Sequence, residues 1–288
     1  MAPDGSIYFM DWHKPLIGHL QHHLRDPNRD QDHGRIYRLT FEGVPLLKPA
    51  VIAGQPIEKL LDLLKEPENN VRERTKIELG SRDTKAVMAA VDLWVAALDK
   101  MDPAYEHHVL EALWVKQYHN VVDVPLIRRV LESPEPRARA QAARVVCYQR
   151  ESIPEATTLL KVAAGDVNPR VRLEAIRAAS FFAGKDLPAA YEIIYGSLKH
   201  QGDYYIDYTY KETMRQLGLL SKDVPLPQDP VVLAAMVERM SDADLAKAAP
   251  SEIVLLSRIE RQSTGLDQRG KALDDIMKFI AIPVGKHF

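Results

Sequence analysis

The sequence predicts a mostly α-helical protein, an α-solenoid of paired helices preceded by a short N-terminal β hairpin. Three observations predict this fold. Turn-forming residues recur every 33 residues at Pro103, Pro136 and Pro169. An amphipathic helical pattern lies on both sides of these turns, and strand patterns are confined to the first 50 residues. Two helices per period of about 33 residues is typical of a solenoid, in which each unit buries its apolar face only by stacking on its neighbours.

The composition excludes several classes of protein. Of the 288 residues, 46% are hydrophobic and 27% are charged, which is ordinary for a globular protein and wrong for a disordered one. The net charge of −2 argues against a dedicated nucleic-acid-binding protein, which normally carries a marked basic excess. The single cysteine, Cys147, excludes an internal disulfide framework, a cysteine-rich zinc site and a c-type haem attached within these residues. No apolar run approaches the roughly 20 residues of a membrane helix, so we expect no transmembrane segment.

Two strands are predicted near the N-terminus. Residues 5–12 are rich in β-formers and follow the turn dipeptide Asp4-Gly5. Residues 34–42 alternate between two sides, as a strand does. Because an isolated hairpin is marginal in water, the two strands must either pack on the helices or belong to a larger sheet. We favour the larger sheet, and we expect the chain to be a piece of a longer protein.

The helical pattern begins after Pro56, a residue that is well tolerated at a helix start. Apolar residues recur on one face of this first helix, at Ile57, Leu60, Leu61 and Leu64. Glu66-Pro67 is expected to end it. The 33-residue period then predicts five equivalent turns, at Asn70, Pro103, Pro136, Pro169 and Gly202.

The second helix of each pair opens with a recurring pattern. It is Pro-Arg-x-Arg at residues 136–139 and 169–172, and Val71-Arg72 is a relative of it. A proline-initiated helix with an arginine in its first turn favours HEAT/armadillo-like repeats over ankyrin or tetratricopeptide units, whose signature turns are absent. We therefore expect three regions: a β-strand remnant over 1–50, a HEAT-like solenoid over 51–220 and divergent helical repeats over 221–288.

The repeat pattern degrades past Leu220. Further helices are predicted to start at Asp229-Pro230, at Ser241 and at Pro250-Ser251-Glu252. Ser241 is followed by two aspartates, which is typical of a helix N-cap with an acidic first turn. Because no polar capping repeat follows, the solenoid is expected to stop in the middle of a repeat.

The densest group of chemically reactive side chains lies in residues 13–35. It contains five of the ten histidines, namely His13, His19, His22, His23 and His33. If residues 15–24 form a helix, His19 and His23 share one face at a spacing that can bind zinc. Asp26 and Asp30 begin a calcium-like loop, although the glycine and the glutamate that such a loop needs are missing.

These observations leave three interpretations of residues 13–35 open. One is a metal site with His19, His23, Asp26 and Asp30 as ligands. The second is a structural loop in which carboxylates pair with nearby arginines and cap turns. The third is the rim of a substrate or cofactor site. The structural loop is the interpretation that we favour.

Four arginines recur along the solenoid at 33-residue offsets, namely Arg139, Arg144, Arg172 and Arg177. They predict a possible interaction surface with an affinity for anions. In the alternative interpretation, each arginine pairs with an acidic residue of a neighbouring turn, such as Glu132, Glu135 or Asp166. The net charge of −2 favours such pairing.

Tyrosines are concentrated in the helix predicted after Gly202. Two of them, Tyr204 and Tyr208, stand one helical turn apart. We expect these two rings to fill the layer between helices, with their hydroxyl groups reaching the rim.

Taken together, the residues resemble a known family, the large membrane-bound dehydrogenase-like proteins of planctomycetes and verrucomicrobia. The resemblance is carried by DWHKPLIGHLQHHLRDPNRDQDHGRIYRLTFEG, PIEKLLDLLKEPENNVRERTKIEL, YEHHVLEALWVKQYHNVVD and DYYIDYTYKETMRQL. In these proteins a sorbosone- or glucose-dehydrogenase-like β-propeller is followed by HEAT repeats and usually by a c-type cytochrome domain. The resemblance implies that residues 1–50 are the last strands of the final propeller blade. It assigns no catalytic residue to a position in this sequence.

The resemblance also shapes the expected function. We expect a scaffold that links an oxidoreductase propeller to a cytochrome domain, so its partners are other domains of the parent chain or another protein, not nucleic acid. The parent would use a quinone and haem c, and would be exported to the periplasm, while these residues bind no cofactor themselves. Two alternatives stay open. One is part of a sugar or alcohol dehydrogenase with residues 13–35 at a metal or cofactor site, and the other is a free-standing HEAT protein that binds peptides.

Overall fold

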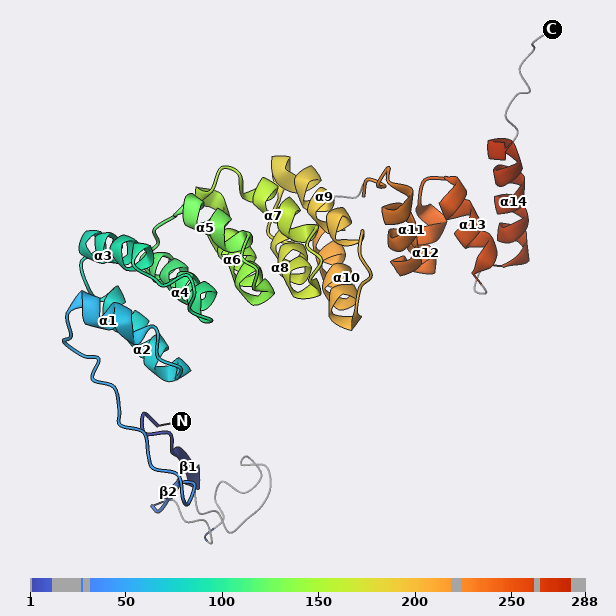
Figure 1. The fold of residues 1–288 in the computed structure, drawn as a ribbon. Helices are drawn as coiled ribbons and strands as arrows, with labels where there is room; N and C mark the ends of the chain where they lie inside the picture. The colour runs from blue at the N-terminus through green and yellow to red at the C-terminus, as the bar shows by residue number, and fades with distance from the viewer. Residues whose placement is uncertain (1, 12–26, 28–31, 219–223, 262–264, 281–288) are drawn as a thin grey trace. The chain divides into compact units, whose positions relative to one another are not determined.

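The computed structural model describes residues 2–11, 27, 32–218, 224–261 and 265–280. Within them the chain is a series of fourteen α-helices preceded by one two-stranded antiparallel hairpin (Figure 1). The predicted fold class, a HEAT/armadillo-like helical solenoid with an N-terminal hairpin, is therefore confirmed. The chain divides into two compact units, Met1–Leu98 and Asp99–Phe288, which are described one at a time.

The hairpin consists of β1 (Ile7–Asp11) and β2 (Arg35–Leu39), both inside the predicted strand ranges. Ile7 pairs with Leu39 and Asp11 with Arg35, so the register runs without a bulge. Directly paired residues share a face of the sheet. The Phe9 and Tyr37 rings stack on one face, with their centroids 5.1 Å apart.

The first unit also contains α1 (Ile57–Leu63), α2 (Asn69–Gly80) and α3 (Thr84–Ala96). Helix α1 packs on both α2 and α3. Leu60, Leu61 and Leu64 are fully buried, as the helical spacing predicts. Asp83 caps α3 by accepting a hydrogen bond from the backbone N–H of Ala86 at 2.9 Å.

The second unit begins with seven helices, which alternate between two layers. One layer holds α4 (Tyr105–Tyr118), α6 (Pro136–Tyr148), α8 (Pro169–Ala179) and α10 (Tyr204–Gly218). The other holds α5 (Val124–Leu131), α7 (Ala156–Ala164) and α9 (Leu187–Ser197). Successive helices of the first layer pack on one another. In the second layer α5 packs on α4 and α6, α7 packs on α6 and α8, and α9 packs on α8 and α7. The stacking of α5 to α10 is visible in Figure 1.

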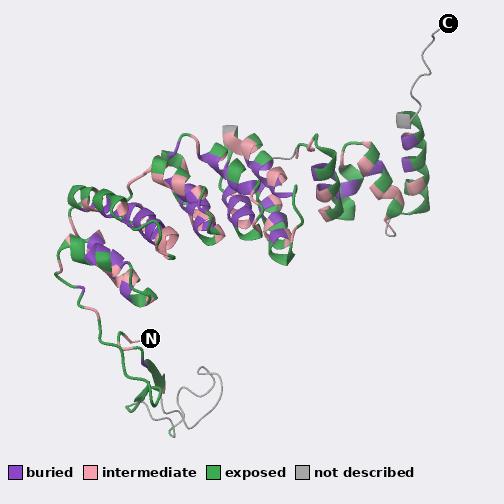
Figure 2. Cartoon of the chain, in the orientation of Figure 1, coloured by how far each residue is buried: buried purple, intermediate pink, exposed green. Residues whose placement is uncertain are grey.

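The core of this unit is densest where α6 packs on α8. Small side chains line both helices and are fully buried: Ala142, Ala143, Ala175, Ala178 and Ala179. Alanine lets two helix backbones approach closely and is the best helix former. In Figure 2 the buried residues lie along the interior sides of these helices.

The second unit ends with α11 (Pro230–Arg239), α12 (Asp242–Lys247), α13 (Glu252–Glu260) and α14 (Leu266–Ile280). Helices α11 to α13 begin with side-chain caps, from Asp229, Ser241 and Ser251 respectively, at the predicted helix starts. Their cores are small. One cluster comprises Leu233, Val237, Leu245 and Val254, and another comprises Leu255, Ala272 and Ile276.

The prediction for the tyrosines of α10 is wrong. Tyr204 and Tyr208 are exposed, and their rings stack on each other outside the core with centroids 6.5 Å apart. The buried face of α10 is instead formed by residues at i, i+4, i+7 and i+11: Ile206, Tyr210, Thr213 and Leu217. Positions two residues apart on a helix point to nearly opposite sides, so the burial of Ile206 places its neighbours at 204 and 208 outward.

No helix in the described ranges is both long enough and apolar enough to span a bilayer.

Candidate interaction surface

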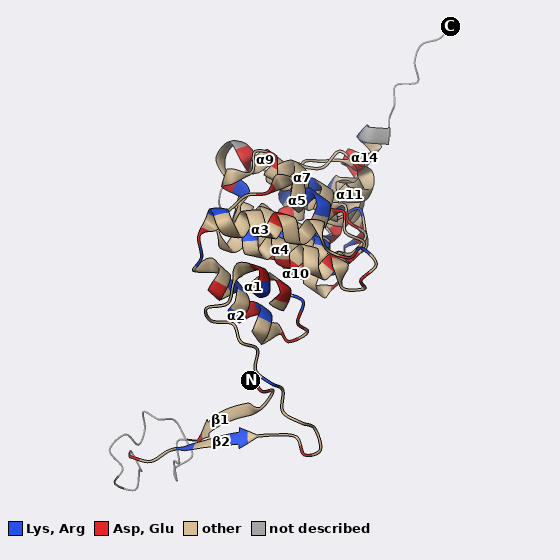
Figure 3. Ribbon diagram, turned by 60° about the vertical axis from the view of Figure 1, so that its left-hand side comes forward, with Lys and Arg blue, Asp and Glu red and all other residues tan. Residues whose placement is uncertain are grey.

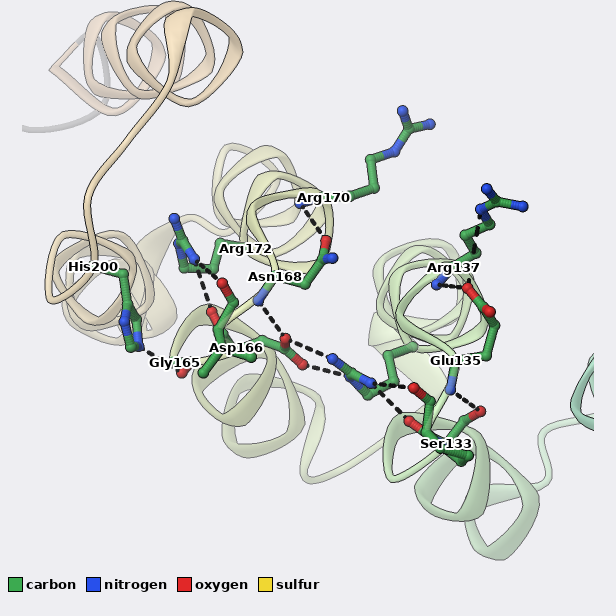
Figure 4. A network of polar contacts seen from close by, with 12 residues as sticks. Ser133, Glu135, Arg137, Gly165, Asp166, Asn168, Arg170, Arg172 and His200 are labelled. Atoms are coloured by element: carbon green, nitrogen blue, oxygen red, sulfur yellow. Dashed lines mark hydrogen bonds and ion pairs between the residues drawn. The ribbon is translucent and has the colours of Figure 1, made fainter.

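The two arginines of the Pro-Arg-x-Arg pattern at the start of α6 and α8 point in opposite directions. Proline occupies the first helical position in both, after the caps Glu135 and Asn168, which accept hydrogen bonds from the N–H groups two residues on. Two residues along a helix correspond to a turn of about 200°. The first arginine of each pattern, Arg137 or Arg170, therefore points away from the helices into solvent (Figure 4). The second turns back toward the preceding loop.

The second arginine of the pattern makes the same contact in three helix pairs. Its Nη1 atom donates to the backbone carbonyls six and five residues before it. The distances are 2.6 and 2.7 Å for Arg72, 2.8 and 3.3 Å for Arg139, and 2.9 Å for both bonds of Arg172. Each of these arginines thus satisfies the carbonyls of the turn that leads into its own helix.

Two of these arginines also contact the next helix pair along the chain. Arg139 binds the Asp166 carboxylate with two parallel hydrogen bonds, of 2.6 Å from Nε and 2.9 Å from Nη2. Arg172 donates from Nη2 to the carbonyl of Gln201 at 2.7 Å. In the same loop between α9 and α10, the Nε2 atom of His200 lies 3.1 Å from the carbonyl oxygen of Gly165. The turns of consecutive units are therefore joined in a chain, as Figure 4 shows.

The pKa values of the charged residues in this network follow from their burial and their hydrogen-bond partners. Burial by itself would raise the pKa of Asp166, but the Arg139 guanidinium and the backbone N–H of Asn168 outweigh it, and the pKa of Asp166 is lowered. Arg172 is only 2% exposed, and this burial lowers its pKa. The side chains of Arg139 and Arg172 thus connect the turns of consecutive helix pairs.

Arg144 and Arg177 lie elsewhere on α6 and α8, and their side chains are half-buried, 43% and 28% exposed. Arg177 lies over the Tyr148 ring of the preceding helix pair, with its Cζ atom 5.6 Å from the ring centroid. Arg144 lies 5.8 Å from the same ring, and Arg177 also lies 5.9 Å from the ring of Phe181. Both guanidinium groups share one buried carboxylate, Glu174, at 3.8 Å and 3.0 Å.

The four arginines predicted as one surface therefore fall into two rows with different roles. The spacing explains the split, because Arg139 and Arg144 are five residues apart and so about 140° apart around α6. Sequence reasoning missed Arg137 and Arg170 as members of the exposed row. The repeated Pro-Arg-x-Arg pattern contained the signal, since position 137 precedes Arg144 by seven residues, two full helical turns.

The remaining predicted site, with His19, His23, Asp26 and Asp30, lies outside the described residues, in the part of the chain between β1 and β2. In the ranges that are described, no three His, Cys, Asp or Glu side chains gather where they would hold a metal ion. Cys147 is buried in α6, and this burial raises the pKa of its thiol. A buried neutral thiol is a small apolar side chain rather than a nucleophile.

Helix pairs stacked in two layers and joined turn to turn define a class, the α-helical repeat proteins that present a surface to other proteins. Residues 122–209, from just before α5 into α10, match the family model of HEAT repeats. A comparison with curated proteins found no match.

Proposed function

We propose that this chain is the HEAT-repeat scaffold of a larger dehydrogenase-like protein. In this proposal β1 and β2 complete the last blade of a β-propeller oxidoreductase domain. The helical repeats carry the interaction surface that links this propeller to a cytochrome domain. The HEAT-repeat match over residues 122–209 supports the scaffold, and the exposure of the hairpin supports the propeller connection.

The observation that carries the proposal is the exposure of large apolar side chains on both faces of the hairpin. On one face the paired residues Met10 and Ile36 are 74% and 73% exposed. On the other, Phe9 and Tyr37 are 50% and 42% exposed. Figure 2 shows the hairpin as exposed along nearly its whole length, and Figure 3 shows β1 almost without charged residues.

Such a hairpin requires a protein environment. Two strands alone are marginally stable in water, and burying one large apolar side chain stabilises a protein by about 1.5–3 kcal/mol. Propeller blades are small antiparallel sheets that pack face to face around a channel, so a strand pair within a blade is covered on both faces. A hairpin that carries exposed large apolar side chains on both faces, and that has no third strand among the described residues, has the properties of such a pair.

Site-specific photo-cross-linking tests this proposal. Met10 is replaced by p-benzoylphenylalanine in the full chain, produced in cells of its own organism, and the cross-linked peptides are identified by mass spectrometry. We expect cross-links to strands of a propeller domain, whether on the same polypeptide or a separate one. The matched control places the same residue at Ile77, an exposed apolar position on α2. Cross-links from position 10 only to a second copy of the hairpin, or a pattern equal to that from position 77, would contradict the proposal.

A further inference from the structure

The exposed row described above extends over two consecutive units as a repeated pattern. On α6 it comprises Arg137, Arg144 and Tyr148, and 33 residues later it comprises Arg170, Arg177 and Phe181. We call these six residues the arginine surface. Arg137, Arg144 and Tyr148 are spaced at i, i+7 and i+11, which places them along one side of α6. Arg170 and Arg177 are likewise two turns apart on α8, and Phe181 follows in the turn after that helix. Arg177 lies over the ring of Tyr148, with its Cζ atom 5.6 Å from the ring centroid, and so joins the residues of the second helix pair to those of the first.

The arginine surface is positively charged. The five arginines on and beside it, which include Arg150 against the ring of Phe181, contact three carboxylates, those of Glu135, Glu151 and Glu174. Arg137 is 93% exposed and reaches Glu135 only at 4.0 Å. In the described part of the chain, no ion pair involves Arg170. The excess of positive charge is local, because the whole chain has a net charge of −2.

Aromatic rings and the Glu174 carboxylate hold the guanidinium groups of Arg144 and Arg177, which lie between the more exposed Arg137 and Arg170. Tyr148 and Phe181 are 55% and 50% exposed. The exposed guanidinium groups of Arg137 and Arg170 can each bind a carboxylate with two parallel hydrogen bonds. The exposed ring edges add apolar contact area beside each cation. Carboxylates flanked by apolar side chains match this alternation.

From this pattern we propose that the arginine surface binds an extended acidic segment of a protein partner, in which Asp or Glu alternates with apolar residues. This inference rests on the proposed function, because it names the chemistry that a scaffold surface would recognise. A nucleic acid fits the surface less well. Buried Glu174 lies between the two central arginines, and the chain lacks the overall basic charge that attracts a polyphosphate.

Fluorescence anisotropy with the full chain tests the proposal. The probe is a fluorescein-labelled peptide of alternating Asp and Phe, compared with a peptide of alternating Lys and Phe and with a single-stranded oligonucleotide of similar length. We expect binding of the acidic peptide only, and binding that weakens as salt is raised, since exposed charges are screened over about 10 Å at 0.1 M salt. Equal binding of the basic peptide, or tighter binding of the oligonucleotide, would overturn the proposal.

Charge-reversal variants locate the site. Arg137→Glu/Arg170→Glu changes two exposed side chains and should weaken peptide binding by at least about tenfold. The matched control, Arg128→Glu/Lys161→Glu, makes the same change in net charge on α5 and α7, in the other layer, and should alter binding by less than about twofold.

Circular dichroism shows whether each variant is folded. The variant Arg144→Lys/Arg177→Lys gives a second test, which preserves the charge and removes the guanidinium groups beside the rings. An equal loss in the control would refute the site. Cross-linking from position 10 is independent of these residues, so the failure of one proposal is distinguishable from the failure of the other.

Discussion

At the scale of single residues, the ion pair between Arg139 and Asp166 joins two units of the solenoid. Its side chains are largely buried, and the contact is bidentate, with distances of 2.6 and 2.9 Å. Most exposed ion pairs contribute little to stability, because water screens them and long side chains lose freedom. This pair differs because the Arg139 guanidinium also donates to the carbonyls of Ser133 and Pro134.

We therefore expect Asp166→Asn to lower the free energy of unfolding by about 2 kcal/mol, since a charge-assisted hydrogen bond is lost from a partly buried site. The measurement is urea denaturation of wild-type and variant chains followed by circular dichroism. The control is Glu151→Gln, which breaks the exposed ion pair with Arg150 and should cost no more than about 1 kcal/mol. Equal effects of the two substitutions would show that burial of the Arg139–Asp166 pair is unimportant.

The same carboxylate predicts a pH dependence. Because folding lowers the pKa of Asp166, its contribution is fully present above the pKa of an unfolded aspartate, about 3.9, and is lost as the pH falls through the lower folded value. The difference in stability between wild type and Asp166→Asn should therefore be constant from pH 7 to pH 5 and shrink below about pH 4. Urea midpoints measured over this range check the prediction, and a difference that grew toward acid pH would contradict it.

At the scale of elements, helices α6 and α8 depend on alanine. Their buried alanines leave no space for a larger side chain where the two helices meet. Ala175→Leu should lower the stability by about 1–3 kcal/mol, because extra methylene groups in a packed core force backbone shifts. The control is Ala234→Leu on the exposed side of α11, expected to change stability by less than about 0.5 kcal/mol. Comparison of thermal unfolding curves tests this, and a stable Ala175→Leu variant would mean that the interface is loosely packed.

Elements were the part of this protein that the sequence predicted best. The starts of α6, α8, α11 and α12 follow from proline at the first helical position or from a capping side chain, both of which act locally. The tyrosines of α10 show where this reasoning fails. Periodicity identifies two possible faces for Tyr204 and Tyr208, and only the packing of Tyr210 and its neighbours against the adjacent helices decides which face is buried. That burial also raises the pKa of Tyr210 to about 12.

The positions of the four arginines could be predicted only in part, for a related reason. A 33-residue offset identifies equivalent residues in different units, but it does not tell which way each of them points. Arg139 and Arg172 recur as regularly as Arg144 and Arg177, yet the first two donate hydrogen bonds to turn carbonyls and the last two lie over exposed aromatic rings. The fate of an arginine depends on its rotation about the helix axis and on carbonyl groups whose positions only the folded turn supplies.

At the scale of the whole molecule, the second unit is stabilised mainly by contacts between neighbouring helices. Repeat proteins of this kind have stabilities that are approximately sums over units and interfaces, so different regions open with different free energies. Helix α8 packs on α6, α7, α9 and α10, and α6 is similarly surrounded. Helix α14 packs substantially only on α13, through the small cluster of Leu255, Ala272 and Ile276. The described cores therefore predict a gradient of stability along the chain.

Native-state hydrogen exchange measured by mass spectrometry should reveal this gradient. We expect the slowest amides in α6 and α8, with protection at least about 100-fold greater than in α12 and α14, because opening the terminal helices exposes far less apolar surface. The Ala175→Leu variant supplies an internal control. If the helix pairs of the second unit open separately, this substitution should reduce protection in α6 to α9 and leave the exchange of α13 and α14 unchanged. Uniform protection, or an equal loss of protection in all helices of the variant, would instead show that the second unit unfolds as one cooperative body, and the additive description would then be wrong.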